Sequence, residues 1–274
     1  MKYYLLTFIF VSLSIGSATL CFAELQLENV PTQSGLLRGH IDQGEQVVYA
    51  GQPLKTTPGG IFIIGFGRDV EPQQTLTWID AAGTPHPYKL SLKQRKYDIQ
   101  RIDGISKRMM NPSEEDLQRI HQEALQVAKA RQHKSDRLNF QETFIWPVIG
   151  RISGIYGSQR ILNGEPRRPH FGIDIAAVKG TPVIAPAGGV VTLAHQGMFY
   201  SGGTMIIDHG YGLSSSFLHL SKILVKVGDQ VAQGEVIARV GASGRVTGPH
   251  LDWRINWFDQ RLDPALLVPE MPSH

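Results

Sequence analysis

Short runs of β-branched and aromatic residues, separated by glycine, proline and aspartate, make up most of this 274-residue chain. Such runs form strands, and the residues between them favour tight turns. Between residues 24 and 92 the clearest runs are 46–49, 61–64 and 75–79, and similar runs recur from about 140 to 258. The chain is therefore predicted to be mainly β. We expect a small N-terminal β-sandwich and, after it, an antiparallel β-sheet.

One helix is predicted between the two β-rich regions. Asn111, Pro112 and the acids at 114–116 supply a cap, a first-turn proline and suitable charges for a helix N-terminus. Residues at helical spacing then form one stripe, made of Leu117, Ile120, Ala124, Val127, Ala128 and Arg131. We expect a helix from about 112 to 134 that links two domains, since the stripe is too short for a coiled coil.

The first 23 residues have the pattern of an export signal. Lys2 is followed by an apolar stretch at 3–22, and Ala23 stands at a junction with polar sequence. We predict cleavage after Ala23 and a periplasmic or secreted protein; the alternative is an uncleaved anchor, because the stretch approaches the ~20 residues that span a bilayer. No later segment is apolar for that long, so no membrane span is expected after signal removal. Cys21 is the only cysteine, so no disulfide or thiolate is expected afterwards.

These patterns divide the chain into a predicted signal peptide at 1–23, a β-sandwich domain at 24–110, a linker helix at 111–138 and a second β-domain at 139–274. The charge is nearly balanced, with 27 Lys and Arg against 24 Asp and Glu, so nucleic acid is not expected as a partner. Arg167 and Arg168, beside His170, would favour an anionic polymer locally.

Three histidines and two aspartates in the second β-rich region have the spacing of a metal site. His170 with Asp174, and His250 with Asp252, lie at even spacings in strand-like sequence, so each pair can point to one face of a sheet. His219 lies between them and could carry a proton beside a metal. The pattern favours a zinc hydrolase with nitrogen and oxygen ligands.

The region from about Trp146 to Trp257 resembles the lysostaphin-type, or LytM-type, zinc endopeptidases, which cut peptide cross-links in bacterial peptidoglycan. The matching motifs follow the family's order: Tyr156-Gly157 to Arg160, His170 to Asp174, residues 180–185, Asp208-His209-Gly210, His219-Leu220-Ser221, and Thr247-Gly248-Pro249-His250-Leu251. The resemblance implies a LytM-like peptidase domain, a Zn²⁺ cofactor and peptidoglycan peptides as partners. It also implies that His170 and Asp174 are ligands, and that His219 and His250 transfer protons or stabilise an oxyanion.

The sequence departs from the family at the third ligand. The family has a histidine where this chain has Asp252. A carboxylate binds Zn²⁺ at ~2.0–2.2 Å, so Asp252 is expected to be the third ligand, although a site with two carboxylates also suits harder ions such as Mn²⁺. The alternative is that Asp252 forms an ion pair with Arg254.

Other polar residues of this region have weaker signals. Arg160 and Asn163 are predicted to line a substrate groove, although loop polarity explains them equally well. His195 and His209 match no motif role, so we expect them at the surface or in turns.

The sequence is compatible with three functions. The leading hypothesis is a peptidoglycan endopeptidase, whose N-terminal sandwich modulates access to the site. The rival is a degenerate relative that binds and activates a cell-wall amidase, which the missing third histidine favours; the protein partners considered are such an amidase or a regulatory protein. The third is a carrier domain, because residues 227–237 resemble the hairpin of biotinyl and lipoyl carriers, but no suitably placed lysine is present.

Overall fold

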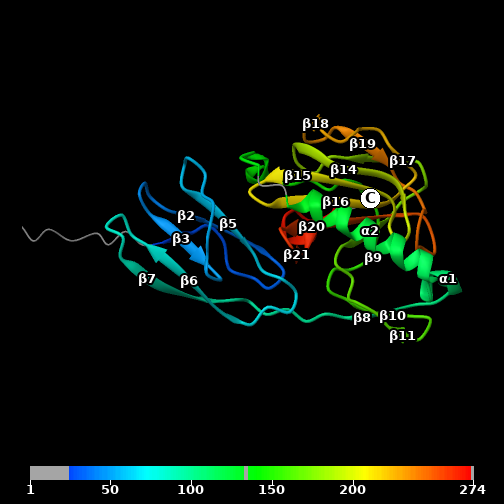
Figure 1. The fold of residues 1–274 in the computed structure, drawn as a ribbon, viewed down its shortest axis with the longest axis horizontal. Coiled ribbons are helices and arrows are strands. Elements are labelled where there is room, and N and C mark those ends of the chain that lie inside the picture. The colour runs from blue at the N-terminus through cyan, green and yellow to red at the C-terminus, as the bar shows by residue number, and fades with distance from the viewer. Residues whose placement is uncertain (1–24, 133–134, 273–274) are drawn as a thin grey trace, which may run out of the picture.

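The computed structural model describes residues 25–132 and 135–272, so the predicted export signal lies outside the described residues. The two β-rich regions form two lobes, and α2 lies across the larger, C-terminal one (Figure 1). In the part of the chain that is described, no helix is both long enough and apolar enough to cross a bilayer.

The N-terminal lobe contains two small antiparallel sheets. The strand order is β1-β2-β5 in one and β4-β3-β6-β7 in the other. The bounds are β1 Gln26–Leu27, β2 Leu36–His40, β3 Gln46–Tyr49, β4 Gln52–Pro53, β5 Ile61–Gly65, β6 Gln73–Ile79 and β7 Pro85–Ser91. Phe62, Leu76 and Leu90 are buried in its core, whereas exposed positions alternate along β7 as in a sheet with one solvated face. This confirms the predicted sandwich.

The connection between the lobes contains β8 (Ile99–Ile102), α1 (Lys107–Met110) and α2 (Glu114–Arg131). The predicted helix is present as α2, but its cap is Ser113, whose hydroxyl accepts a hydrogen bond from the Asp116 backbone N–H. Asn111 instead ends α1.

The buried face of α2 differs from the predicted stripe. Val127 and Ala130 pack on the main sheet, but Leu117 is 53% exposed. Asp116 and Glu123 are buried in its place, because Arg108 pairs with Asp116 and the backbone N–H of Phe199 donates to Glu123. The buried face is therefore shifted by about one residue from the predicted stripe, and polar residues with fixed partners form part of it.

The C-terminal lobe is built on an eight-stranded antiparallel sheet of order β18-β14-β15-β16-β20-β12-β9, with β21 paired to β20. Its strands are β9 Ile152–Gly154, β12 Ile173–Ala176, β14 Gly189–Met198, β15 Gly202–Gly210, β16 Leu213–Leu220, β18 Gln230–Val231, β20 His250–Trp257 and β21 Gln260–Leu262. Every residue of β15 and β16 is buried. The lobe therefore confirms the predicted antiparallel sheet.

Two smaller sheets flank the main one. They have the orders β11-β10-β8 and β13-β19-β17, and β8 pairs with β10 in parallel. The remaining elements are β10 Gln159–Leu162, β11 Glu165–Pro166, β13 Pro182–Ile184, β17 Lys222–Ile223, β19 Val236–Arg239, and the 3₁₀ helices η1 Asn139–Gln141 and η2 Pro264–Leu266. The hairpin expected at 227–237 is wrong, because β18 and β19 belong to different sheets.

Candidate metal centre

Strand β20 presents apolar residues to one face of the main sheet and polar residues to the other. The residues in the apolar core are Leu251, Trp253 and Ile255. His250, Asp252 and Arg254 alternate with them and share the opposite face, as the sequence spacing predicted for His250 and Asp252.

Two buried carboxylates face one another across neighbouring strands. Asp174 on β12 lies directly opposite Asp252 on β20, and the two residues are 6% and 0% exposed. Like charges at directly opposite positions repel each other. The pair therefore requires positive charge close by.

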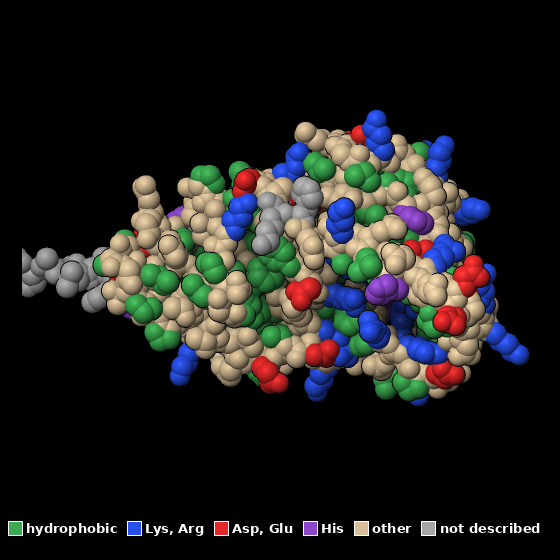
Figure 2. All heavy atoms as spheres, in the orientation of Figure 1, with side chains coloured by type: hydrophobic (Ala, Val, Ile, Leu, Met, Phe, Trp, Pro, Cys, Tyr) green, Lys and Arg blue, Asp and Glu red, His purple; other side chains and the backbone are tan. Residues whose placement is uncertain are grey.

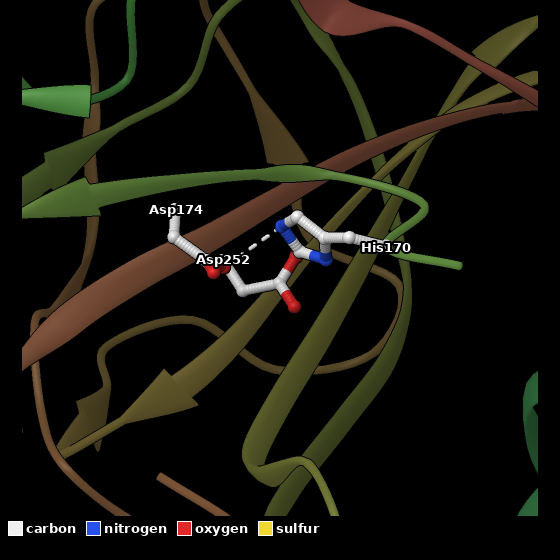
Figure 3. A group of neighbouring side chains, drawn as sticks. All are labelled: His170, Asp174 and Asp252. Carbon is white, nitrogen blue, oxygen red and sulfur yellow. Dashed lines mark ion pairs between the residues drawn. The ribbon is translucent and has the colours of Figure 1, made fainter. Parts of the chain in front are cut away.

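His170 brings a ring to the same place from the segment that precedes β12. Its Nε2 lies 3.0 Å from Oδ1 of Asp174, and Figure 3 shows His170, Asp174 and Asp252 converging on one point. Apart from this ion-pair contact, neither ring nitrogen of His170 nor Oδ1 of Asp174 has a hydrogen-bond partner within the described residues. Buried polar atoms normally have such partners, so these three are available to a ligand.

Two arginines hold the carboxylates in position. Arg254 donates to both oxygens of Asp252, at 2.9 and 2.6 Å, and Arg160 donates to Oδ2 of Asp174 at 2.7 Å. Burial raises the pKa of Asp252, but the Arg254 guanidinium outweighs it and holds that pKa well below its usual range. Burial likewise opposes ionisation of Asp174, and the nearby His170 and Arg160 lower its pKa overall.

Asp252 and Arg254 thus form the ion pair that the sequence offered as an alternative to metal ligation by Asp252. It does not exclude ligation, because each carboxylate oxygen has two lone pairs and Arg254 uses one on each. Carboxylates that bind metals are commonly held by such outer hydrogen bonds.

His219 and His250 direct the same ring nitrogen toward the carboxylates. The Nδ1–H of each ring donates to a backbone carbonyl oxygen, at 2.8 Å for His219 and 2.9 Å for His250. In the neutral ring Nε2 is then the acceptor. Nε2 of His219 lies 3.9 Å from Asp252, Nε2 of His250 lies 3.7 Å from Asp174, and the ring centroids are 4.9 Å apart. Burial lowers the pKa of His219 to about 4, so this ring is neutral near pH 7.

The residues present fit a bound metal ion. One donor atom from each of His170, Asp174 and Asp252 lies within 4.8 Å of the others. A set of one imidazole and two carboxylates suits Zn²⁺ with an open coordination position. A cation there would offset the repulsion between the carboxylates and occupy the free donor atoms of His170 and Asp174. The roles predicted for the site residues remain predictions.

A groove of about 550 Å³ opens on this centre, and His170 and His219 belong to its lining. Arg160 also lines it, as predicted. Asn163 does not: it lies in the turn after β10, where its side chain accepts from the backbone N–H of Ile105 and donates to the carbonyl oxygen of the same residue.

The surface or turn position expected for His209 is wrong. This residue is fully buried, its Nδ1–H donates to the carbonyl oxygen of Gly188, and its Nε2 accepts from the hydroxyl of Ser215. His195 accepts a hydrogen bond from the backbone N–H of Gly197 and lies outside the groove lining.

Sequence reasoning missed Arg245 and Arg261, which also line the groove. The pairing of Arg254 with Asp252 was anticipated as an alternative to ligation, and alternation along β20 places the two residues on the same face. No pattern in the sequence connects Arg245 or Arg261 to His170, since only the fold brings them together.

Comparison with known proteins gives a consistent assignment. Residues 168–264 match Peptidase family M23. Peptidoglycan DD-endopeptidase ShyA of Vibrio cholerae is 42% identical over 106 residues, which are 38% of this chain and 24% of ShyA. DD-carboxypeptidase/endopeptidase Mpg of Neisseria meningitidis is 39% identical over 127 residues, which are 45% of this chain and 29% of Mpg. The chain thus aligns with less than a third of the length of these curated relatives.

A solved structure extends the likeness to both lobes. A Pseudomonas aeruginosa protein, provisionally described as a peptidase M23, is 32% identical, with a TM-score of 0.66. The match covers 88% of this chain and 96% of that one. On this match across nearly the whole length, and on the motifs that form the centre, the chain belongs to peptidase family M23.

Proposed function

We propose that this protein is a zinc-dependent endopeptidase that cleaves peptide cross-links of bacterial peptidoglycan. The observation that carries the proposal is the convergence of His170, Asp174 and Asp252 within 4.8 Å, with Nε2 of His219 and of His250 directed at the same place. The name of ShyA, a peptidoglycan DD-endopeptidase, supports the substrate class, and the name of Mpg supports endopeptidase activity.

His170, Asp174 and Asp252 would hold the zinc ion, each through one donor atom. When bound, zinc supplies Lewis-acid chemistry, which polarises a carbonyl group and makes a water molecule more acidic. With two carboxylates and one imidazole, the donor set offsets more of the ion's charge than the family's single carboxylate would. We therefore expect slower turnover than in relatives with two histidine ligands.

His219 suits the role of general base. Its ring is neutral near pH 7, Nε2 is the free acceptor, and Nδ1–H is fixed by a backbone carbonyl. The ring takes a proton from the attacking water, and the carboxylate of Asp252, 3.9 Å away, stabilises the resulting imidazolium. The same proton can then pass to the leaving amine. His250 stands on the other side and, when protonated, donates from Nε2 to the developing oxyanion.

The rival role, activation of a separate amidase, is not favoured. The chain retains both histidines beside the centre and three convergent metal donors, which a binding-only domain does not need.

We also propose the domain division given by the sequence, with the peptidase domain at 139–274, and with the sandwich at 24–110 and the linker helix at 111–138 modulating access. Two observations support a role in access: Ile120 of α2 lines the groove, and β8 extends the β10 hairpin at its edge. Export with cleavage after Ala23 belongs to the same proposal. Mass spectrometry of the mature protein should then give Glu24 as the first residue.

The test uses purified protein and cross-linked muropeptide dimers. We expect monomers to appear, with one water added per bond cleaved, and we expect a chelator to stop the reaction and zinc to restore it. A protein that holds one zinc ion per chain but releases no monomers would overturn the proposed function.

A further inference from the structure

The groove beside the metal centre has a strongly cationic wall. Among the described residues, six arginines line it and no aspartate or glutamate does; the six are Arg160, Arg167, Arg168, Arg245, Arg254 and Arg261. Figure 2 shows Lys and Arg side chains gathered around a hollow below α2, on the side of β10. The chain as a whole is close to neutral, so this concentration is local.

Three of the arginines have carboxylate partners. Arg160 pairs with Asp174 and Arg254 pairs with Asp252. Both aspartates would also bind the metal ion, which further offsets their negative charge. Arg167 pairs with Glu165, an exposed residue.

The other three, Arg168, Arg245 and Arg261, have no carboxylate within ion-pair distance in the described part of the chain. The groove therefore keeps an excess of positive charge even before a metal ion binds.

Aromatic rings hold two of the unpaired guanidinium groups. The Cζ of Arg245 lies 4.3 Å from the ring centroid of Tyr200, and the Cζ of Arg261 lies 4.4 Å from that of Phe171. Stacking fixes the plane of a guanidinium while its N–H edges stay available. Burial lowers the pKa of both arginines, and neighbouring arginines add to this effect. Unpaired charge in such surroundings is unfavourable, so an anion that binds there is stabilised.

We propose that this groove selects acidic peptides, with Arg168, Arg245 and Arg261 binding free carboxylates of the strand that lies across the centre. The planar fork of arginine matches a carboxylate in a two-point hydrogen bond, which a lysine does not provide. The inference rests on the proposed function for its substrate class, since the peptide is taken to be a peptidoglycan stem. Beyond the proposed function, the free carboxylates of the stem peptide, and not only its backbone, determine how tightly the groove binds it.

The test measures binding separately from hydrolysis. The probe is a fluorescein-labelled stem peptide without a cross-link, compared with the same peptide after its carboxylates are converted to carboxamides. Fluorescence anisotropy with the full chain, with and without zinc, should show about tenfold tighter binding of the carboxylate form. The preference should shrink as NaCl rises from about 50 to about 500 mM, because salt screens exposed charges.

The variant Arg168→Gln/Arg245→Gln/Arg261→Gln should bind both peptides equally. Arg151→Gln is the matched control, because Arg151 is exposed and lies outside the groove lining, and it should keep the preference. Should the triple variant not fold, Arg168→Gln alone provides the test, since Arg168 is exposed and its replacement leaves the core intact. It should reduce the preference severalfold.

The outcomes separate this inference from the proposed function. Equal binding of both peptides by the wild type, or an undiminished preference in the arginine variants, overturns the inference even where cross-links are cleaved. A carboxylate preference that depends on these arginines supports the inference even where no hydrolysis occurs, and in that case only the proposed endopeptidase activity fails.

Discussion

The N-terminal sandwich and the main sheet differ in what they bury. In the described part of residues 25–92, the buried polar side chains are Gln33, Ser34 and Thr57, and none carries a charge. The main sheet and the segment just before β12 bury titratable groups, namely His170, Asp174, Asp208, His209, His219 and Asp252. Buried charge is unfavourable unless it is paired. The interior of the sandwich therefore has no buried charge to compensate, whereas the main sheet has an electrostatic cost that comes with assembling its titratable groups.

The strongest test of this difference is Asp252→Ala. The substitution removes one proposed ligand and leaves the half-buried Arg254 without its carboxylate. We expect stoichiometric zinc to be lost, activity to disappear, and the free energy of unfolding to fall by about 3–5 kcal/mol. Elemental analysis after dialysis and urea denaturation provide the measurements.

Asp42→Ala is the control in the other lobe, because Asp42 is exposed, and it should change none of these quantities. Asp252→Asn, which keeps the shape without the charge, should weaken zinc binding strongly. Full zinc occupancy in Asp252→Ala would show that Asp252 only pairs with Arg254.

His219→Ala should separate chemistry from metal binding. The proposed ligands are unchanged, so zinc should stay bound, but the general base is lost and kcat should fall by about 10²–10⁴-fold. Assays of muropeptide cleavage at fixed zinc content check this. His195→Ala, which changes a histidine outside the groove, should retain normal kcat. A His219→Ala protein with undiminished turnover would exclude the proposed role of this ring.

Leu76→Ala should lower stability and leave the chemistry intact, the opposite of what is expected for His219→Ala. This side chain is fully buried in the sandwich, so its truncation leaves a cavity and lowers the free energy of unfolding by about 2–5 kcal/mol. At temperatures where the variant is folded, we expect normal zinc content and normal kcat. Loss of zinc in this variant would show that the stability of the sandwich and the integrity of the centre are coupled.

The smallest expected effect concerns His209. Burial lowers the pKa of this ring, so the folded protein keeps it neutral while the unfolded chain takes up a proton with a pKa near ~6.5. Its contribution to stability is therefore present above about pH 6.5. Below that pH it falls by at most about 1.4 kcal/mol per pH unit, until the folded pKa is reached.

The measurement is the free energy of unfolding at several pH values, compared between wild type and His209→Gln. The wild type should lose more stability on acidification than the variant does. His121→Gln, a change at an exposed position of α2, should follow the wild type. Equal pH dependence in His209→Gln and wild type would contradict the assignment.

Part of this structure could be predicted because it follows from local pattern. The strand period of two places His250 and Asp252 on one face, and the runs at 46–49 and 61–64 are strands. The acidic first turn of α2 was also visible in the sequence, although the cap is Ser113 and not the predicted Asn111.

What could not be predicted depends on partners far along the chain. His209 can be buried because Gly188 and Ser215 form hydrogen bonds with its two ring nitrogens. The residues next to His209 in the sequence give no sign of these partners. Glu123 turns inward because a backbone N–H of the main sheet's β14–β15 connection needs an acceptor. The arginine groove is likewise a product of the fold.

The place of β20 has a consequence for how the protein acquires its activity. This strand is the last long one in the sequence, yet it lies between β16 and β12, inside the sheet. Pairing of this kind joins distant parts of the chain and makes folding slow. A nascent chain that has emerged only as far as β19 has His170, Asp174 and His219 but no Asp252 or His250. The proposed hydrolase is therefore inert until β20 pairs with β16 and β12 and brings Asp252 and His250 to the centre.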